Sequence, residues 1–157
     1  EVRGDLYARM DDPNWEVTPE YVLVMKNSGP VGAPGMPEWG FMPIAKKILA
    51  MGVRDMVRLS DARMSGTAFG TVVVHVTPES SGGGPLSVVR DGDEIELDVP
   101  NRVLKLNIDD VEFRKRLEDP GRPAPEFKRG YKRFHAQHIM QADKGCDFDF
   151  LRSELLN

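Results

Sequence analysis

The stretch Val53–Val76 reads VRDMVRLSDARMSGTAFGTVVVHV and contains two Val-rich runs separated by small residues. The apolar character of Val53–Leu59 and of Thr71–Val76 predicts two buried strands. Ser60–Gly70 connects them and is rich in Ser, Ala, Gly and Thr, which predicts a loop. Because loops that follow buried strands commonly carry functional residues, this loop is a first candidate site.

The residues before this stretch predict a further strand, a long loop and a helix. Tyr21–Met25 (YVLVM) is a short apolar run typical of a buried strand. Asn27–Gly40 is rich in glycine and proline, which interrupt regular structure, so it predicts a loop. Apolar residues at helical spacing in Phe41–Met51, followed by Gly52, predict a helix with a glycine after its last turn.

The residues after the opening stretch predict a hairpin and two helices. Ile95–Val99 and Leu104–Ile108 alternate apolar and polar residues on either side of a Pro-Asn pair, the pattern of a β-hairpin. Asp109 or Asp110 can cap a following helix, and Phe127–Met140 predicts a last helix. Interspersed short strands with few helices predict a mixed α/β domain built around a curled sheet or β-barrel.

The whole-chain numbers exclude several classes of protein. The chain has 157 residues, enough for one domain, and its net charge of −4 argues against broad nucleic-acid binding. No apolar run approaches the length of a membrane span. The single cysteine, Cys146, excludes an internal disulfide and a multi-cysteine metal site. A cytoplasmic or organelle-matrix location fits this cysteine usage.

The chain begins at Glu1 rather than at methionine. Residues 1–20 have mixed charge, little periodicity and two turn signals, which indicates a polar lead-in. We therefore expect a segment of a longer protein, in which residues 1–20 lead in from a preceding large domain. Residues 21–157 are then expected to form the C-terminal domain.

The loop rich in glycine and proline ends in a carboxylate, Glu38, just before the predicted helix. A carboxylate in a loop after a buried strand can bind a hard cation such as Mg²⁺, which prefers oxygen ligands. The alternative is a structural role, because the helix dipole stabilises negative charge near a helix N-terminus. The position of Glu38 in the sequence does not decide between a metal ligand and this structural role.

The Ser-rich loop of the opening stretch can bind an anionic ligand. Gly66 gives the backbone room to approach a ligand, and free N–H groups with the Ser65 and Thr67 hydroxyls can hold a carboxylate or alkoxide oxygen. Asp61 or Arg63 can set the loop through a salt bridge. An ordinary Ser/Thr turn is the alternative. Ser65 has no obvious base as a neighbour, so an adjacent metal ion is the better activator.

The three histidines offer little metal chemistry. His75 interrupts an apolar run and is interpreted as a satisfied core residue. His135 and His138 are three residues apart on a predicted helix and can share a face, but no third ligand accompanies them, so zinc is not expected. The basic segment Phe113–His135 is interpreted as a solvated face, and Cys146 as a packed thiol.

Four motifs of the chain together resemble one enzyme family. They are GPVGAPGMPEWG (Gly29–Gly40), RLSDARMSGTAFG (Arg58–Gly70), HVTPESSGGGPLSVVRDGDEIELDVPNRVL (His75–Leu104) and QADKGCDFDFL (Gln141–Leu151). In this order they resemble the C-terminal part of the dihydroxy-acid, phosphogluconate and sugar-acid dehydratases. The resemblance runs from about Asp5 to the end of the chain, and looks closest to the arabinonate/xylonate branch.

This resemblance implies an aconitase-like swivelling β/β/α domain that closes over a large N-terminal domain. It implies two cofactors, Mg²⁺ and an iron–sulfur cluster, with the cluster cysteines and most Mg²⁺ ligands in that large domain. Carried onto this sequence, the metal-ligating glutamate of the family is Glu38. The serine whose alkoxide abstracts the substrate proton is Ser65, and Thr67 helps to hold the substrate.

The implied reaction is the dehydration of a sugar acid or 2,3-dihydroxy acid to a 2-keto acid. The resemblance implies a cytoplasmic hydro-lyase that is a homo-oligomer (dimer or tetramer), with no nucleic-acid or membrane partner. The chain alone is expected to be inactive, because a cluster needs several cysteines. Two other hypotheses stay open, a free-standing swivelling subunit of an aconitase-like hydro-lyase and a non-catalytic binding module.

Overall fold

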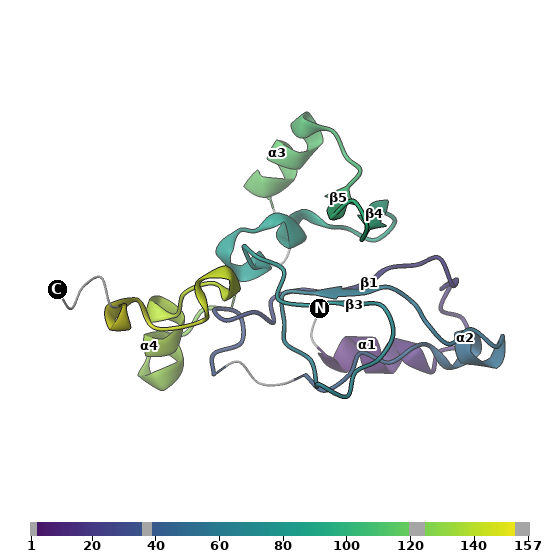
Figure 1. The fold of residues 1–157 in the computed structure, drawn as a ribbon, viewed down its shortest axis with the longest axis horizontal. Helices are drawn as coiled ribbons and strands as arrows, with labels where there is room; N and C mark the ends of the chain where they lie inside the picture. Colours follow the sequence, from purple (N-terminus) through teal and green to yellow (C-terminus); the bar gives the residue numbers. More distant parts are fainter. Residues whose placement is uncertain (1–2, 36–38, 120–124, 153–157) are drawn as a thin grey trace.

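The structure, a computed structural model, describes residues 3–35, 39–119 and 125–152 (Figure 1). Its helices and strands are α1 (Arg3–Met10), β1 (Leu23–Met25), α2 (Lys46–Ala50), β2 (Arg58–Ser60), β3 (Val72–Val73), β4 (Ile95–Asp98), β5 (Val103–Leu106), α3 (Asp110–Glu118) and α4 (Gly130–His138). The mixed α/β class is therefore confirmed. None of the described helices is long and apolar enough to cross a membrane.

The centre of the fold is a parallel sheet in the order β1-β2-β3. Both pairings are parallel, with Leu23 opposite Arg58 and Arg58 opposite Val72. All three strands therefore run in the same direction. All three predicted strands exist, but each is shorter than predicted. Because parallel strands end at the same edge of a sheet, the loops that follow them start from one side.

The predicted hairpin and the helix after it are confirmed. β4 and β5 pair antiparallel, with Ile95 opposite Leu106 and Asp98 opposite Val103. Asp109 caps α3, because its Oδ1 accepts the N–H of Glu112 at 2.8 Å, as a helix N-cap does. Hairpin and α3 lie on one side of the parallel sheet, and α1 lies on the other (Figure 1).

Two helix predictions need correction, and one helix was not predicted. Residues 1–20 were interpreted as a polar lead-in, but α1 occupies Arg3–Met10. The helix predicted over Phe41–Met51 covers only Lys46–Ala50, because Pro43 restricts the residue before it to extended backbone. The last helix is α4, Gly130–His138, and is shorter than predicted because it begins only after an extended Arg129.

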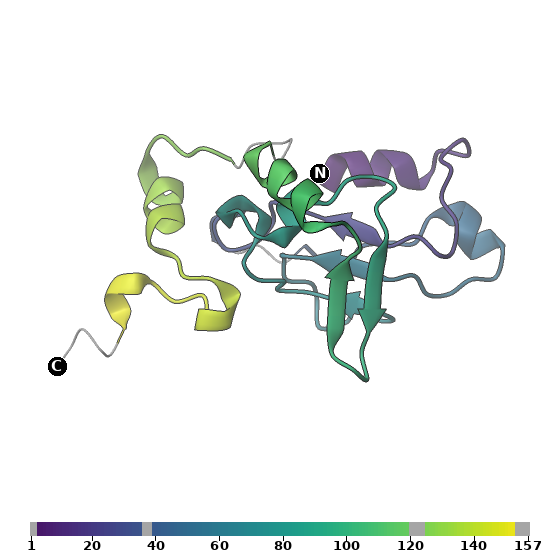
Figure 2. The ribbon, with the colours of Figure 1, turned by 90° about the horizontal axis from the view of Figure 1, so that it is seen from above.

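The described residues close no barrel, which corrects the barrel alternative of the expected fold. The parallel strands and the hairpin form two separate sheets. Figure 2 shows that the hairpin strands run across the direction of the parallel strands and do not extend their sheet. A closed barrel needs every strand edge to be paired, whereas β1 and β3 are each edge strands of this sheet.

The hydrophobic core lies between α1, α2 and the parallel sheet and is rich in methionine, a flexible side chain that fills irregular gaps. Its buried members are Met10, Val17, Leu23, Met25, Met42, Ile44, Ala45, Ile48, Met56 and Ala62. Two of them, Met10 and Val17, come from the first twenty residues, so this segment packs into the domain.

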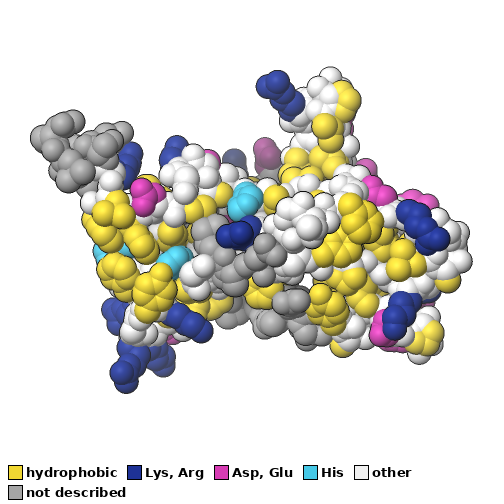
Figure 3. Space-filling view, turned by 60° about the horizontal axis from the view of Figure 1, so that its bottom comes forward, with side chains coloured by type: hydrophobic (Ala, Val, Ile, Leu, Met, Phe, Trp, Pro, Cys, Tyr) yellow, Lys and Arg dark blue, Asp and Glu magenta, His cyan; other side chains and the backbone are white. Residues whose placement is uncertain are grey.

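The C-terminal segment, residues 125–152, lies at one end of the molecule (Figure 2). An antiparallel bridge between Ile139 and Phe148 folds the tail back onto α4. Phe134 packs against Phe148 and Phe150, and these two rings stack with centroids 5.4 Å apart. Exposed apolar side chains gather over this end, where Lys and Arg side chains also project (Figure 3).

Candidate functional site

Asp61 ties together the loops that follow the three parallel strands. Its carboxylate is 1% exposed and accepts the N–H of Ser28 at 3.0 Å, the N–H of Ser80 at 2.9 Å and the Ser80 hydroxyl. Asp61 follows β2, Ser28 follows β1, and Ser80 lies beyond β3. Asp61 was expected to set its loop through a salt bridge, but it does so through these neutral donors.

Glu79 holds the glycine-rich loop after β1. The carboxylate is 1% exposed and accepts the N–H groups of Val31 at 2.7 Å and Gly32 at 3.0 Å. Gln141 completes the arrangement, since its Nε2 donates to Glu79 Oε1 and its Oε1 accepts the Glu79 N–H, both at 2.8 Å. A Cβ on Gly29 would lie 2.5 Å from Glu79 Oε2, so this loop needs glycine there.

The structure brings the two candidate loops together. Ser65 donates its N–H to the carbonyl of Gly40 at 2.7 Å, and Trp39 donates its N–H to the carbonyl of Arg63 at 3.3 Å. The residues just after Glu38 therefore pair with the backbone around Ser65. Glu38 itself lies outside the described residues, so its predicted role stays a prediction.

Ser65 and Thr67 form a hydroxyl pair at a turn. Their Oγ and Oγ1 atoms are 2.8 Å apart, and the N–H of Thr67 donates to Ser65 Oγ at 3.2 Å. With Thr67 as donor, Ser65 Oγ receives two hydrogen bonds, which stabilise a negative charge on that oxygen. A Cβ added to Gly66 would meet only open space, so a ligand has room beside the pair.

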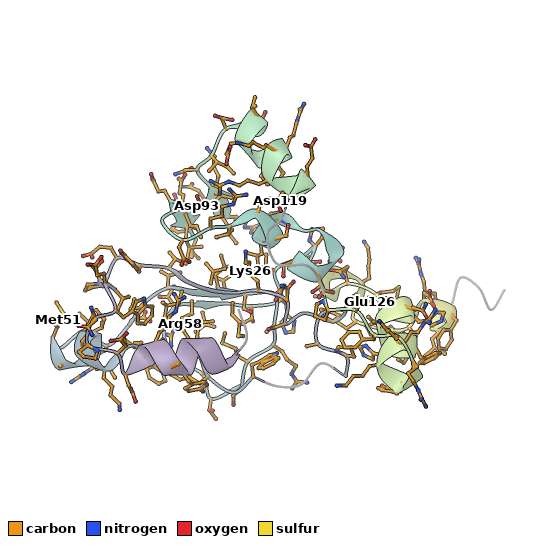
Figure 4. All side chains as sticks on the ribbon, turned by 180° about the vertical axis from the view of Figure 1, so that it is seen from behind. Lys26, Met51, Arg58, Asp93, Asp119 and Glu126 are labelled. Atoms are coloured by element: carbon orange, nitrogen blue, oxygen red, sulfur yellow. The ribbon has the colours of Figure 1, made fainter. Side chains whose placement is uncertain are left out.

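Arg58, labelled in Figure 4, anchors this loop through the carbonyl of Phe69 and was missed by the sequence analysis. The Arg58 guanidinium is fully buried. Its central carbon lies 4.7 Å from the centroid of the Phe41 ring, and the Phe69 ring stacks on Phe41. Arg58 donates hydrogen bonds to the carbonyls of Met56, Met42 and Phe69 and to the carboxylate of Asp55. A charged residue within a predicted buried strand was the signal that could have found it.

The pKa values of Arg58 and Asp55 are both shifted by their surroundings. Burial lowers the pKa of Arg58, and the nearby Asp55 carboxylate opposes that shift. Burial acts to raise the pKa of Asp55, but hydrogen bonds from Thr71 and the charge of Arg58 outweigh it, so this pKa is lowered. Both groups therefore stay charged, and the same carboxylate holds the N–H of Thr71, where the loop returns to β3.

The described residues do not fit an iron–sulfur cluster. Within them, no group of three or more His, Cys, Asp or Glu side chains is arranged to hold a metal ion. The chain has one cysteine, whereas clusters are held by several cysteine thiolates. Burial raises the pKa of this half-buried Cys146 thiol, with Glu79 and Asp143 adding to the effect, which disfavours the thiolate.

The histidines differ from their predicted roles. His75 is exposed rather than buried, so its interpretation as a core residue is wrong. It lies after the end of β3, with a left-handed φ of 55°. His135 is buried and accepts the N–H of Gly35 at its Nε2, whereas His138 Nδ1 lies 3.1 Å from Asp149 Oδ1. The two rings therefore have different partners.

The buried imidazole of His135 predicts a pH dependence of stability. Burial lowers its pKa in the folded chain, so the unfolded chain binds a proton more readily. Unfolding then takes up a proton as the pH falls below about 6.5, the usual pKa of histidine, and the free energy of unfolding decreases. Urea unfolding between pH 8 and pH 5 should show this slope, and His135→Phe should reduce it; an equal slope in both proteins would contradict the assignment.

Residues 2–146 match the model of one family, Dihydroxy-acid/6-phosphogluconate dehydratase C-terminal. The chain belongs to this family. The resemblance drawn from the four motifs is thereby confirmed, and those motifs supply Asp61, Glu79 and the Ser65 turn of this dehydratase domain.

The relatives of this dehydratase domain carry the names of enzymes for different acids. The 6-deoxy-6-sulfo-D-gluconate dehydratase of Pseudomonas putida is 49% identical over 148 residues, which cover 94% of this chain and 26% of that protein. An L-arabinonate dehydratase of Rhizobium leguminosarum is 51% identical, over 94% of this chain and 26% of that protein. A dihydroxy-acid dehydratase of Acetivibrio thermocellus is 38% identical, over 85% of this chain and 24% of its own length. The chain thus spans about a quarter of these relatives.

Proposed function

We propose that this chain is the C-terminal domain of a hydro-lyase that dehydrates a sugar acid or a 2,3-dihydroxy acid to a 2-keto acid. The observation that carries the proposal is the Ser65–Thr67 pair, in which Ser65 Oγ can accept two hydrogen bonds beside open space. Ser65 is the base, and Thr67 holds it and the substrate. The dehydratase names of the relatives support the reaction class.

In the proposed reaction, Ser65 Oγ takes the proton from the carbon that bears the substrate carboxylate. The electron pair of that C–H bond forms a double bond to the next carbon, whose hydroxyl leaves and is protonated to water. The resulting enol takes up a proton and becomes the 2-keto acid. The Thr67 hydroxyl and N–H keep Ser65 Oγ oriented and stabilise its charge before the proton arrives.

Glu38 is proposed as a Mg²⁺ ligand next to this base. A bound Mg²⁺ would supply positive charge to the substrate carboxylate and so stabilise the negative charge of the intermediate. One carboxylate is a poor Mg²⁺ site, since this ion takes an octahedral shell of oxygens. The other ligands and the iron–sulfur cluster are therefore assigned to the large N-terminal domain of the same protein.

The glutamate proposal predicts a metal phenotype. In the full-length protein, Glu38→Gln should raise the Mg²⁺ concentration for half-maximal turnover by at least about tenfold, because changes that merely support a metal ligand already cost 10–100-fold. Turnover measured across a Mg²⁺ titration tests this, with Glu126→Gln, an exposed carboxylate far along the chain, as the matched control. A Glu38→Gln protein with unaltered Mg²⁺ dependence would assign Glu38 a structural role.

The same proposal includes an aconitase-like swivelling domain of residues 21–157, with residues 1–20 leading in from the large domain. A groove of about 970 Å³ lies along β1, at the edge with which no described strand pairs. Its position supports the proposal that a partner docks there. Leu23 donates its N–H to Val57, so the backbone groups of Val22 and Val24 point away from β2. Because the relatives are about four times as long as the chain, the proposed occupant is an extended segment of the large domain.

Docking at β1 predicts a change in hydrogen exchange. The amide of Val24 should exchange rapidly in the 157-residue chain, because no described strand pairs with this edge of β1, and it should be protected in the full-length protein, where a strand is added. The amide of Leu23, bonded to Val57 in both proteins, is the control. Equal exchange of Val24 in the two proteins would place the large domain elsewhere.

Turnover of a substrate panel tests the proposed function. The full-length protein, purified without oxygen, is given aldonic acids and 2,3-dihydroxy acids, and 2-keto acid is measured. Formation of a keto acid from at least one compound is expected. No keto acid from any of them, with intact cofactors, would favour a binding module, and a start codon just before Glu1 would favour a free-standing subunit.

A further inference from the structure

The guanidinium of Arg58 joins the two backbone segments that flank the Ser65 turn. Its Nη1 donates to the carbonyl of Met42 at 3.2 Å, and its Nη2 donates to the carbonyl of Phe69 at 2.7 Å. Met42 belongs to the segment that leads into α2, whereas Phe69 ends the Ser65 loop. One side chain therefore fixes how these two segments lie against each other.

The same two segments bind Ser65 directly. Gly40, two residues before Met42, accepts the N–H of Ser65 at 2.7 Å. Thr67, two residues before Phe69, donates its N–H to Ser65 Oγ at 3.2 Å. The position of Ser65 Oγ therefore depends on the relative placement of the two segments, which the guanidinium determines.

The guanidinium itself is held from several directions. The Arg58 side chain is fully buried, its Nε donates to the carbonyl of Met56 at 3.1 Å, and its Nη2 also donates to Asp55 Oδ1 at 3.0 Å. The guanidinium carbon lies over the Phe41 ring, 4.7 Å from the centroid. Because a guanidinium is planar and its N–H groups point in fixed directions, these contacts also fix the bonds to the two flanking segments.

The Ser65 loop passes so close to this ion pair that no side chain fits between them. Gly70 has a φ of +80°, and a Cβ there would lie 2.6 Å from Nη2 of Arg58 and closer still to Asp55 Oδ1. The next residue, Thr71, donates its N–H and its hydroxyl to the Asp55 carboxylate. The end of the loop is therefore packed directly against the Arg58–Asp55 pair.

We propose that Arg58 is a positioning residue for the Ser65 base and holds Ser65 Oγ where it reaches the substrate proton. This inference rests on the proposed role of Ser65 as that base. Arg58 is fully buried, so it acts through the loop rather than by contact with the substrate. A base must lie within hydrogen-bond reach of the proton that it takes, and a misplacement of about 1 Å can cost about 10²-fold in rate.

Two matched substitutions in the full-length protein test this role. Arg58→Lys keeps a positive charge but has no planar fork, so it does not hold both flanking segments in the same geometry. Arg116→Lys makes the same change in a second network, where a largely buried Arg116 binds Asp93 at 2.6 Å and Glu112 at 2.7 Å. Figure 4 shows Asp93 on the hairpin side of the molecule, away from Arg58.

The two variants should differ in turnover. Arg58→Lys should lower kcat by at least about tenfold and leave KM within about threefold of the parent, because a displaced base slows the chemical step. Arg116→Lys should leave kcat within about twofold of the parent, because its network does not touch the Ser65 loop. An unchanged kcat in Arg58→Lys, a loss confined to KM, or equal losses of kcat in both variants would overturn the proposal.

Combination with Ser65→Ala distinguishes positioning of the base from a general effect on the enzyme. If Arg58 acts through Ser65 Oγ, Arg58→Lys should not further lower the residual kcat of Ser65→Ala, so the two losses should not add. An equal fold loss from Arg58→Lys with and without the Ser65 hydroxyl would overturn the proposal.

Hydrogen exchange of the peptide that spans residues 60–70 gives a readout without turnover. Exchange should accelerate in Arg58→Lys and stay near the parent rate in Arg116→Lys, and equal exchange in all three proteins would contradict the inference. Where Arg58→Lys does not fold, Gly70→Ala replaces it in every comparison, because its methyl group would displace the loop from the same guanidinium.

Ser65→Ala alone distinguishes failure of this inference from failure of the proposed function. If Ser65→Ala keeps substantial activity, the proposed base is wrong, and positioning of that base fails with it. If Ser65→Ala loses activity while Arg58→Lys keeps the kcat and the loop exchange of the parent, only the role of Arg58 is wrong.

Discussion

Replacing Ser65 with alanine in the full-length protein is expected to lower the kcat of the proposed dehydration by roughly 10³-fold, within the 10²–10⁴-fold contribution typical of a positioned general base. The variant would lose the oxygen that we propose takes the substrate proton, while the backbone N–H groups and the Gly40 contact that shape the loop are retained. KM should change little, because the base acts in the chemical step. Initial rates of 2-keto acid formation measure both quantities.

Two further variants make this result specific. Ser87→Ala removes a buried hydroxyl that has no hydrogen-bond partner among the described residues, so turnover should be unchanged. Thr67→Val removes the hydroxyl that is paired with Ser65 Oγ and keeps the N–H donor, so the loss should be intermediate. A Ser65→Ala protein that retains substantial activity would refute the base and favour a binding module.

Replacing Arg58 with methionine should destabilise the folded 157-residue chain by about 3–5 kcal/mol, the cost typical of removing one member of a buried charged network. Methionine fills part of the space but donates no hydrogen bonds. The carbonyls of Met42 and Phe69 then lose the donor that they share in the interior, and buried unsatisfied groups are costly. The midpoint of urea unfolding, at an unchanged slope, measures the difference.

Arg54→Met is the matched control for this substitution. Arg54 is exposed and donates one hydrogen bond, to the carbonyl of Leu49, so its replacement should change stability by less than about 0.5 kcal/mol. Equal midpoints for the two variants would mean that the Arg58 network contributes little to the fold. A lower midpoint for Arg58→Met alone would confirm that this network anchors the Ser65 loop.

Local signals explain which elements were predicted correctly. The hairpin and α3 depend on alternation, a turn and the Asp109 cap, whose partner Glu112 is three residues away. The helix over Phe41–Met51 was overextended because apolar spacing outweighed Pro43 in the prediction. α1 was missed because its helical pattern is weak, and it is stabilised by packing, through Met10, on a core that residues far along the chain provide.

The sequence by itself determined the family, the strand-and-loop order and the Ser65–Thr67 turn, because these depend on residues close together in the chain. Only the tertiary structure decided what holds that turn and the glycine-rich loop in place. Asp61 binds Ser80, 19 residues away, Glu79 binds Gln141, 62 residues away, and His135 binds Gly35, 100 residues away. Such bonds form between groups that burial brings together and isolates from water, and no local spacing records which groups will meet.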